Sequence, residues 1–183
     1  LQDIFLPSYA GGIDAGAATV MVNSGSVNGI PAHASRFLLT EELRHRLGFK
    51  GVVISDYGDV PALASAYHIA ADLTGAVAQA VNAGIDVSMT PSDSAGWNSA
   101  LLQAVRQGLV TERRIDESVR RILTLKFQLG LFDHPLVDPD KADAAVKANR
   151  DLARKAAGES ITLLRNQDSA LPLATDLGKI VVT

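Results

Sequence analysis

Asp56 and Tyr57 are the residues with the clearest chemical potential, in the segment GFKGVVISDYGDV that spans residues 48–60. The β-branched run from Val52 to Ile54 predicts a buried strand, so Asp56 falls where a strand ends and a polar loop begins. In parallel α/β folds, the loops after the carboxyl ends of strands converge on one pocket. A carboxylate there can act as a nucleophile or a base, and the ring of Tyr57 can stack on the apolar face of a sugar. An Asp between a strand and a helix is also a common N-cap, so this segment alone leaves both a catalytic and a capping role open.

Other polar or rim residues are weaker candidates. Asp59 is a second carboxylate close to Asp56, but the N-cap preference of Asp favours a helix-cap or loop role. His33 lies in the loop NGIPAHAS and can line the same pocket. Ser88 and Met89 end another strand-like run and are expected at the same rim, although Met89 can equally fill the core.

Strand-like and helix-like segments alternate along the first 130 residues. Three short apolar runs are predicted as strands: Thr19–Asn23, Gly51–Ser55 and Ile85–Met89. Helical patterns are predicted over residues 39–47, 60–82, 97–107 and 112–129, with Thr40 capping the first. This alternation predicts a parallel sheet covered by helices. Three strands are too few for a complete eight-stranded barrel, so the sequence predicts part of a barrel or of an open sheet.

The character of the chain changes after Pro135. Residues 136–174 are predicted to be a helical linker between domains, with a helix over 142–165, and residues 175–183 are predicted to open a second α/β domain. The first residues resemble the middle of a helix and the last resemble the start of a strand. We therefore expect a piece of a longer protein in which residues 1–135 belong to the catalytic domain, and the cellular compartment stays open.

Composition narrows the class of protein. With 47% apolar and 20% charged residues in 183, the chain is expected to be globular. Its net charge of −3 makes nucleic acid an unexpected partner, and no apolar run is long enough to predict a membrane span. There is no cysteine, and the four histidines lack metal-ligand spacing, so no metal or other cofactor is expected.

Four spaced motifs carry a resemblance to a known family. They are VMVNSGSVNGIPAHASRFLLTEELRHRLGFKGVVISDY, NAGIDVSM, RIDESVRRILTLKFQLGLFDHP and ARKAAGESITLLRNQDSALPL. In this order they resemble the family-3 glycoside hydrolases, a group of β-glucosidases and β-xylosidases, over essentially the whole chain. The resemblance implies the C-terminal part of a (β/α)8 barrel, followed by a linker and the first strand of a second α/β sandwich domain.

The resemblance also implies a retaining mechanism with Asp56 as nucleophile. From their positions in the sequence, Tyr57, Ser24, Met89 and His33 are expected near the substrate. Retention requires a second carboxyl group about 5–5.5 Å from the first, which serves as acid and then base. In this family that group, and a sugar-binding Lys-His pair and Arg, would lie outside the present chain. The implied partners are therefore a small carbohydrate and the missing parts of the same enzyme. Many members carry Tyr where this chain has Ser24, so the hydrogen bonding around Asp56 is expected to differ.

Alternatives from other classes remain at this point. A fragment without its acid can be a carbohydrate-binding or structural piece with no turnover. An unrelated barrel enzyme, such as a lyase, can use Asp56 as a base. Within the family, an N-acetylglucosaminidase is a further alternative, because the sequence does not select the sugar.

Overall fold

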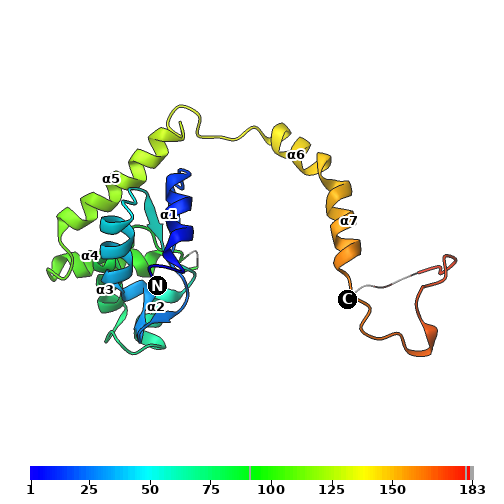
Figure 1. Cartoon of the computed structure of the whole chain (residues 1–183), viewed down its shortest axis with the longest axis horizontal. Coiled ribbons are helices and arrows are strands. Elements are labelled where there is room, and N and C mark those ends of the chain that lie inside the picture. Colours follow the sequence, from blue (N-terminus) through cyan, green and yellow to red (C-terminus); the bar gives the residue numbers. More distant parts are fainter. Residues whose placement is uncertain (91, 180, 182–183) are drawn as a thin grey trace. The chain divides into compact units, whose positions relative to one another are not determined.

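The computed structural model describes residues 1–90, 92–179 and 181, and the chain forms two units, Leu1–Pro135 and Leu136–Thr183 (Figure 1). The first unit is a small parallel sheet with helices packed against it. The second unit is a helical segment. No helix in the described part of the chain is long and apolar enough to cross a membrane.

The sheet of the first unit is built around strand β4 (Val52–Ile54). β4 pairs in parallel with β1 (Thr19–Met21), with Val20 opposite Val53. On its other side, Ile54 forms a parallel bridge with Val87. The predicted parallel pairing of these segments is thus present, although the third makes a single bridge rather than a full strand. A short antiparallel hairpin, β2 (Ser26–Val27) and β3 (Ile30–Pro31), follows β1.

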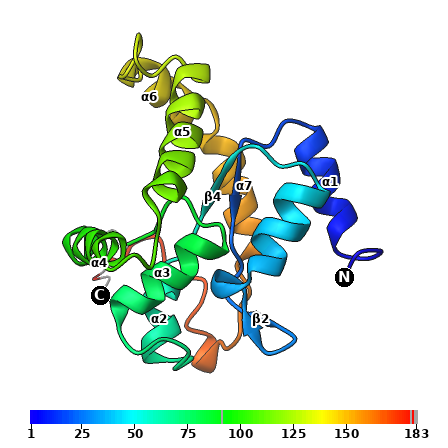
Figure 2. The same ribbon diagram turned by 90° about the vertical axis from the view of Figure 1, so that its left-hand side faces the viewer.

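Among its described residues, the first unit has one helix before β1 and six after it. They are α1 (Leu6–Asp14), the 3₁₀ helix η1 (Ala32–Ala34), the π-type helix η2 (Phe37–Arg46), α2 (Asp59–Ser65), α3 (Leu73–Ala83), α4 (Ser94–Arg106) and α5 (Glu112–Gln128). Helices α2, α3 and α4 lie beside one another, α3 packing against both of the others (Figure 2).

Two sequence predictions about these helices were wrong. Residues 60–82 were expected to form one helix, but α2 ends at Ser65 and the backbone turns at His68, where φ is +53°. Helix α3 then starts because Asp72 caps it by accepting the Gly75 N–H at 2.7 Å. Thr40 does not cap η2, since this helix begins three residues earlier, at Phe37. Its hydroxyl instead donates to the carbonyl of Ala83 at 2.8 Å and so joins η2 to α3.

The core lies between the sheet and α2 and α3. Val53 of β4, Val60 and Leu63 of α2, and Val77 of α3 are fully buried together with Ile85. Burial of such side chains is the main favourable term in folding. The strand that precedes Asp56 is therefore fixed on its helix-covered face by the best-packed part of the molecule.

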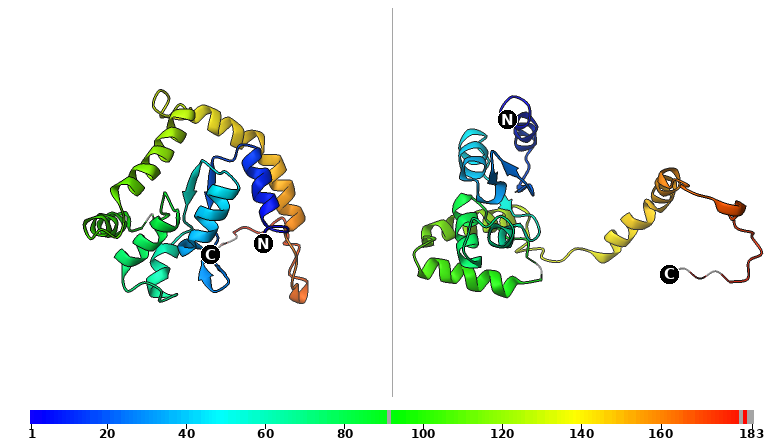
Figure 3. Two further views of the ribbon diagram at one scale, coloured as in Figure 1. Left: turned by 60° about the vertical axis from the view of Figure 1, so that its left-hand side comes forward. Right: turned by 90° about the horizontal axis from the view of Figure 1, so that it is seen from below.

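The second unit contains α6 (Pro139–Ala148) and α7 (Arg150–Ser160), which follow one another (Figure 3), and the short 3₁₀ helix η3 (Gln167–Ser169). The single helix predicted over residues 142–165 is thus two helices. Asp138 starts α6 earlier by accepting the Asp140 N–H at 3.0 Å, and the backbone leaves the helical region at Asn149. In the predicted terminal strand, Lys179 and Val181 are not in a strand, and residues 180, 182 and 183 lie outside the described residues.

Candidate active site

Asp56 lies at the carboxyl edge of the sheet, two residues after β4 ends at Ile54. Its backbone position is fixed by Ser55, which is fully buried. The Ser55 N–H donates to the Val87 carbonyl at 2.9 Å, and its hydroxyl oxygen accepts the Met89 N–H at 2.8 Å. The same hydroxyl donates to the carbonyl of Asp56 at 2.9 Å. A serine inside a buried strand needs such partners, and this is the signal that could have identified Ser55 from the sequence.

The side chain of Asp56 is half-buried, and both of its oxygens accept hydrogen bonds. Oδ1 accepts the N–H of Tyr57 at 2.6 Å, and Oδ2 accepts the hydroxyl of Ser24 at 3.1 Å. The capping role left open by the sequence does not hold, because the N-cap of α2 is Gly58 and no side chain caps that helix. The carboxylate is thus oriented at the sheet edge without serving a helix end.

His33 supports Asp56 from inside the protein. Its side chain is buried in η1, with 2% of the residue exposed, and its Nε2 accepts the Asp56 N–H at 2.9 Å. Nε2 must therefore be unprotonated, which places the proton of the neutral ring on Nδ1. Nδ1 lies 3.5 Å from Oδ2 of Asp59. Burial lowers the pKa of His33, and the charges of Asp59 and Asp56 oppose that shift only in part, so the ring is neutral at pH 7.

Asp59 is the first residue of α2, in agreement with the predicted position at a helix end. Its carboxylate also contacts residues of the candidate site. Its Oδ2 accepts the hydroxyl of Ser24 and faces His33. Since Ser24 has one hydroxyl proton, it donates to Asp56 or to Asp59 at any moment, but not to both. No local pattern in the sequence indicates this link, because it depends on the loop after β1 folding against the start of α2.

The remaining predicted site residues lie at the same edge. Tyr57 is 60% exposed, and its hydroxyl lies 3.5 Å from Oγ of Ser92. Met89 is linked to Asp56 through its backbone N–H and the Ser55 hydroxyl. The structure therefore gathers Asp56 with Tyr57, Ser24, His33 and the backbone of Met89. His33 differs from expectation in one respect, since its ring is buried behind Asp56 and does not face solvent.

An oriented carboxylate with an exposed aromatic ring beside it suits attack on a sugar. Among the described residues, no three His, Asp or Glu side chains gather closely enough to hold a metal ion. A family model described as "Glycosyl hydrolase family 3 N terminal domain" matches residues 1–125. The chain belongs to glycosyl hydrolase family 3. The resemblance carried by the sequence motifs is thus confirmed at the level of the family.

Relatives of this family 3 chain include enzymes of two kinds. A lysosomal beta glucosidase of Dictyostelium discoideum is 45% identical over all of the chain, and a beta-xylosidase of Formosa agariphila is 32% identical over 98% of it. The chain spans 22% and 26% of these two relatives, about a quarter or less of their length.

Solved structures agree with the family assignment. A β-glucosidase from Erythrobacter marinus superimposes with a TM-score of 0.74 at 38% identity, over 92% of this chain and 22% of that one. A β-glucosidase from Listeria innocua, solved in complex with glucose, gives 0.71 at 36% identity over 92% of this chain and 23% of that one. The path of this chain is therefore similar to that of a segment within these larger β-glucosidases.

Proposed function

We propose that the protein carrying this chain is a β-glycosidase that removes terminal β-linked glucose or xylose. The proposal draws on the family and on the β-glucosidases and β-xylosidases among its relatives. The observation that carries it is the position of Asp56, held at the carboxyl edge of a parallel sheet by hydrogen bonds to both carboxylate oxygens.

In the proposed mechanism, Asp56 is the nucleophile of a retaining enzyme. One carboxylate oxygen attacks the anomeric carbon and forms a glycosyl ester, while the glycosidic oxygen leaves with a proton from an acid group. Water then attacks the same carbon, gives its proton to that group acting as a base, and releases the sugar from Asp56. We place the acid/base outside this chain, which makes the missing segments of the enzyme necessary partners.

Ser24, His33 and Asp59 are proposed to position the nucleophile. The Ser24 hydroxyl holds one oxygen of Asp56 but is free to turn to Asp59 once Asp56 has formed the ester. The neutral ring of His33 holds the Asp56 N–H and so fixes the backbone of the loop. A small displacement of the Asp56 carboxylate would lower the reaction rate strongly, because attack requires reacting atoms about 3–3.5 Å apart. Tyr57 is proposed to stack on the sugar, and Met89 to border it.

We further propose that the first unit is the later part of a (β/α)8 barrel. Three parallel segments with covering helices are what such a part would contain. Residues 136–174 would then be the linker and residues 175–183 the start of a second α/β domain. A binding fragment without turnover, or an N-acetylglucosaminidase of the same family, are the competing assignments.

Chromogenic β-glycosides test the proposal in the full-length protein. We expect release of nitrophenol from the β-glucoside or β-xyloside, and a loss of about 10⁴-fold or more in kcat for Asp56→Ala with an unchanged melting temperature. Asp116→Asn, at an exposed position on α5, is the control and should keep full activity. Turnover of only the N-acetylglucosaminide would favour the competing enzyme, and near-normal kcat in Asp56→Ala would refute the assignment of the nucleophile.

A further inference from the structure

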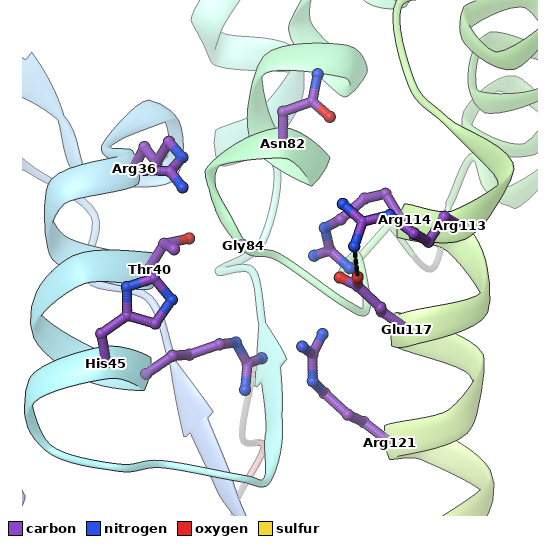
Figure 4. Close-up of a pocket in the computed structure, with 10 residues that line it drawn as sticks. Arg36, Thr40, His45, Asn82, Gly84, Arg113, Arg114, Glu117 and Arg121 are labelled. Carbon is purple, nitrogen blue, oxygen red and sulfur yellow. Dashed lines mark ion pairs between the residues drawn. The ribbon is translucent and has the colours of Figure 1, made fainter.

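A cavity of about 300 Å³ lies between η2, the end of α3 and the first half of α5 (Figure 4). Its most notable feature is its charge, because five of the side chains that line it are arginines: Arg36, Arg44, Arg113, Arg114 and Arg121. Figure 4 shows Arg36 on the η2 wall, and Arg113, Arg114 and Arg121 on the α5 wall opposite. Such a concentration is unexpected in a chain with a net charge of −3.

The base of this cavity is anchored by Asp86, whose side chain is fully buried. Asp86 accepts hydrogen bonds from Arg44 at 2.6 Å and from Arg121 at 2.9 Å, and Arg114 lies 3.4 Å away. It also accepts the Val53 N–H at 3.0 Å. The single negative charge of Asp86 is thus shared by three guanidinium groups, so two of their three positive charges are not neutralised by it.

Arg44 lines the cavity with a side chain whose hydrogen bonding is incomplete. Its side chain is 10% exposed, and its Nε–H is buried without an acceptor among the described residues. A buried donor in this state is costly, and most proteins satisfy such groups. Burial lowers the pKa of Arg44, and the charges of Arg114 and Arg121 act in the same direction against the attraction of Asp86. An anion in the cavity would relieve the repulsion among these arginines.

The two remaining arginines, Arg36 and Arg113, do not change the net positive charge of the cavity. Arg36 pairs with Glu41, and Arg113 pairs with Glu117 at 3.3 Å. With Asp86, three carboxylates therefore face the five arginines, and two positive charges remain. A purely structural role explains Asp86 and the three arginines around it, since charged groups near the amino ends of barrel strands usually serve stability. It does not account for the two positive charges that stay unbalanced around Asp86, since Arg36 and Arg113 each have a glutamate of their own.

The cavity is separate from the proposed catalytic edge. Arg44, which lines the cavity, donates to the Gly51 carbonyl at 3.1 Å, just before β4 begins, whereas Asp56 follows the carboxyl end of that strand. Because a strand advances about 3.3 Å per residue, Gly51 and Asp56 lie beyond opposite ends of β4. A ligand of this cavity is therefore independent of the glycosidase proposal.

We propose that this cavity binds a phosphate-type oxyanion, either free or as the phosphoryl group of a small metabolite. Guanidinium groups match the oxygens of phosphate in paired hydrogen bonds, and a dianion balances the two surplus charges. The volume is at the lower end for ligand pockets and suits a small anionic group.

Calorimetry of the full-length protein with inorganic phosphate tests this, with sodium chloride keeping the ionic strength constant. We expect saturable binding that weakens about three- to tenfold in Arg36→Gln and in Arg113→Gln, because each loses one screened charge-assisted contact. Arg120→Gln is the control, since Arg120 is exposed on the same helix as Arg113 but does not line the cavity. It should bind phosphate as the unaltered protein does.

The same titration is repeated with a phosphate monoester. Tighter binding of the monoester than of inorganic phosphate would identify a phosphorylated metabolite as the natural ligand. Asp56→Ala should leave binding unchanged, which separates this test from that of the proposed activity. Absence of saturable binding, or equal weakening in Arg120→Gln and Arg113→Gln, would overturn the proposal.

Discussion

His33 offers the sharpest test of how the fold prepares Asp56. Its Nε2 accepts the Asp56 N–H at 2.9 Å from a buried position. In His33→Leu that N–H has no acceptor, and an unsatisfied buried donor costs about 1–3 kcal/mol. If the loop moves to relieve this cost, the nucleophile is misplaced, so kcat/KM should fall about 10- to 100-fold.

His33→Gln is the matched variant, because its side-chain oxygen can take over from Nε2 as acceptor while it cannot gain a proton. We expect it to keep kcat/KM within about threefold of the unaltered protein at pH 7, since one acceptor replaces another. Chromogenic glycoside hydrolysis by full-length protein, with a melting curve for each variant, measures both effects. Equal activity of the Leu and Gln variants would refute the positioning role of His33.

The same residue predicts a pH dependence. Burial lowers the pKa of His33 in the folded protein below its pKa in the unfolded chain. At a pH between these two pKa values, the unfolded chain therefore binds more protons than the folded protein. The stability contributed by the neutral ring is therefore present above about pH 6.5 and is lost as the pH falls through the lowered pKa. Protonation of Nε2 also removes the acceptor of the Asp56 N–H. The acidic loss of activity should thus begin at lower pH in His33→Gln than in the unaltered protein.

Other positions give further expected outcomes. Ser24→Ala removes the hydroxyl that reaches Asp56 and should lower kcat about tenfold in the chromogenic assay, with a smaller change in KM. Asp86→Asn leaves three partly buried arginines without their carboxylate and should destabilise the protein by about 3–5 kcal/mol in denaturation, against less than about 0.5 kcal/mol for Asp116→Asn. Gly51→Ala should also lower the melting temperature, because its new Cβ would overlap the carbonyl oxygen of Ala18. A small effect of Asp86→Asn would show that the cluster is not stabilising.

The sequence predicted the position of Asp56 well, because that prediction depended on local signals. The β-branched run before Ser55 marks β4, and the glycines at 48 and 84 end helices with φ of +71° and +135°. The family could also be recognised from the sequence, since its motifs occur in order along the chain. These features are set by neighbours in sequence and so can be recognised in one chain.

Contacts between distant segments were not predictable. His33 and Asp59 meet because the loop after β1 packs against the start of α2, and no local pattern records that meeting. The role of Asp86 cannot be read from the motif NAGID, which shows a carboxylate but not the arginines of η2 and α5 that surround it. The break between α2 and α3 was missed because the Ala-rich composition favours helix on both sides of it.

Trapping of the covalent intermediate tests the central claim most directly. The full-length protein would be incubated with a slow-turnover 2-fluoro β-glucoside, digested and analysed by mass spectrometry. The account predicts one added fluoroglycosyl group on the peptide that contains Asp56, and fragmentation should assign it to that carboxylate. Asp56→Ala should take up no label. A label on Asp59, or glycoside hydrolysis with no label on any peptide, would contradict the role proposed for Asp56.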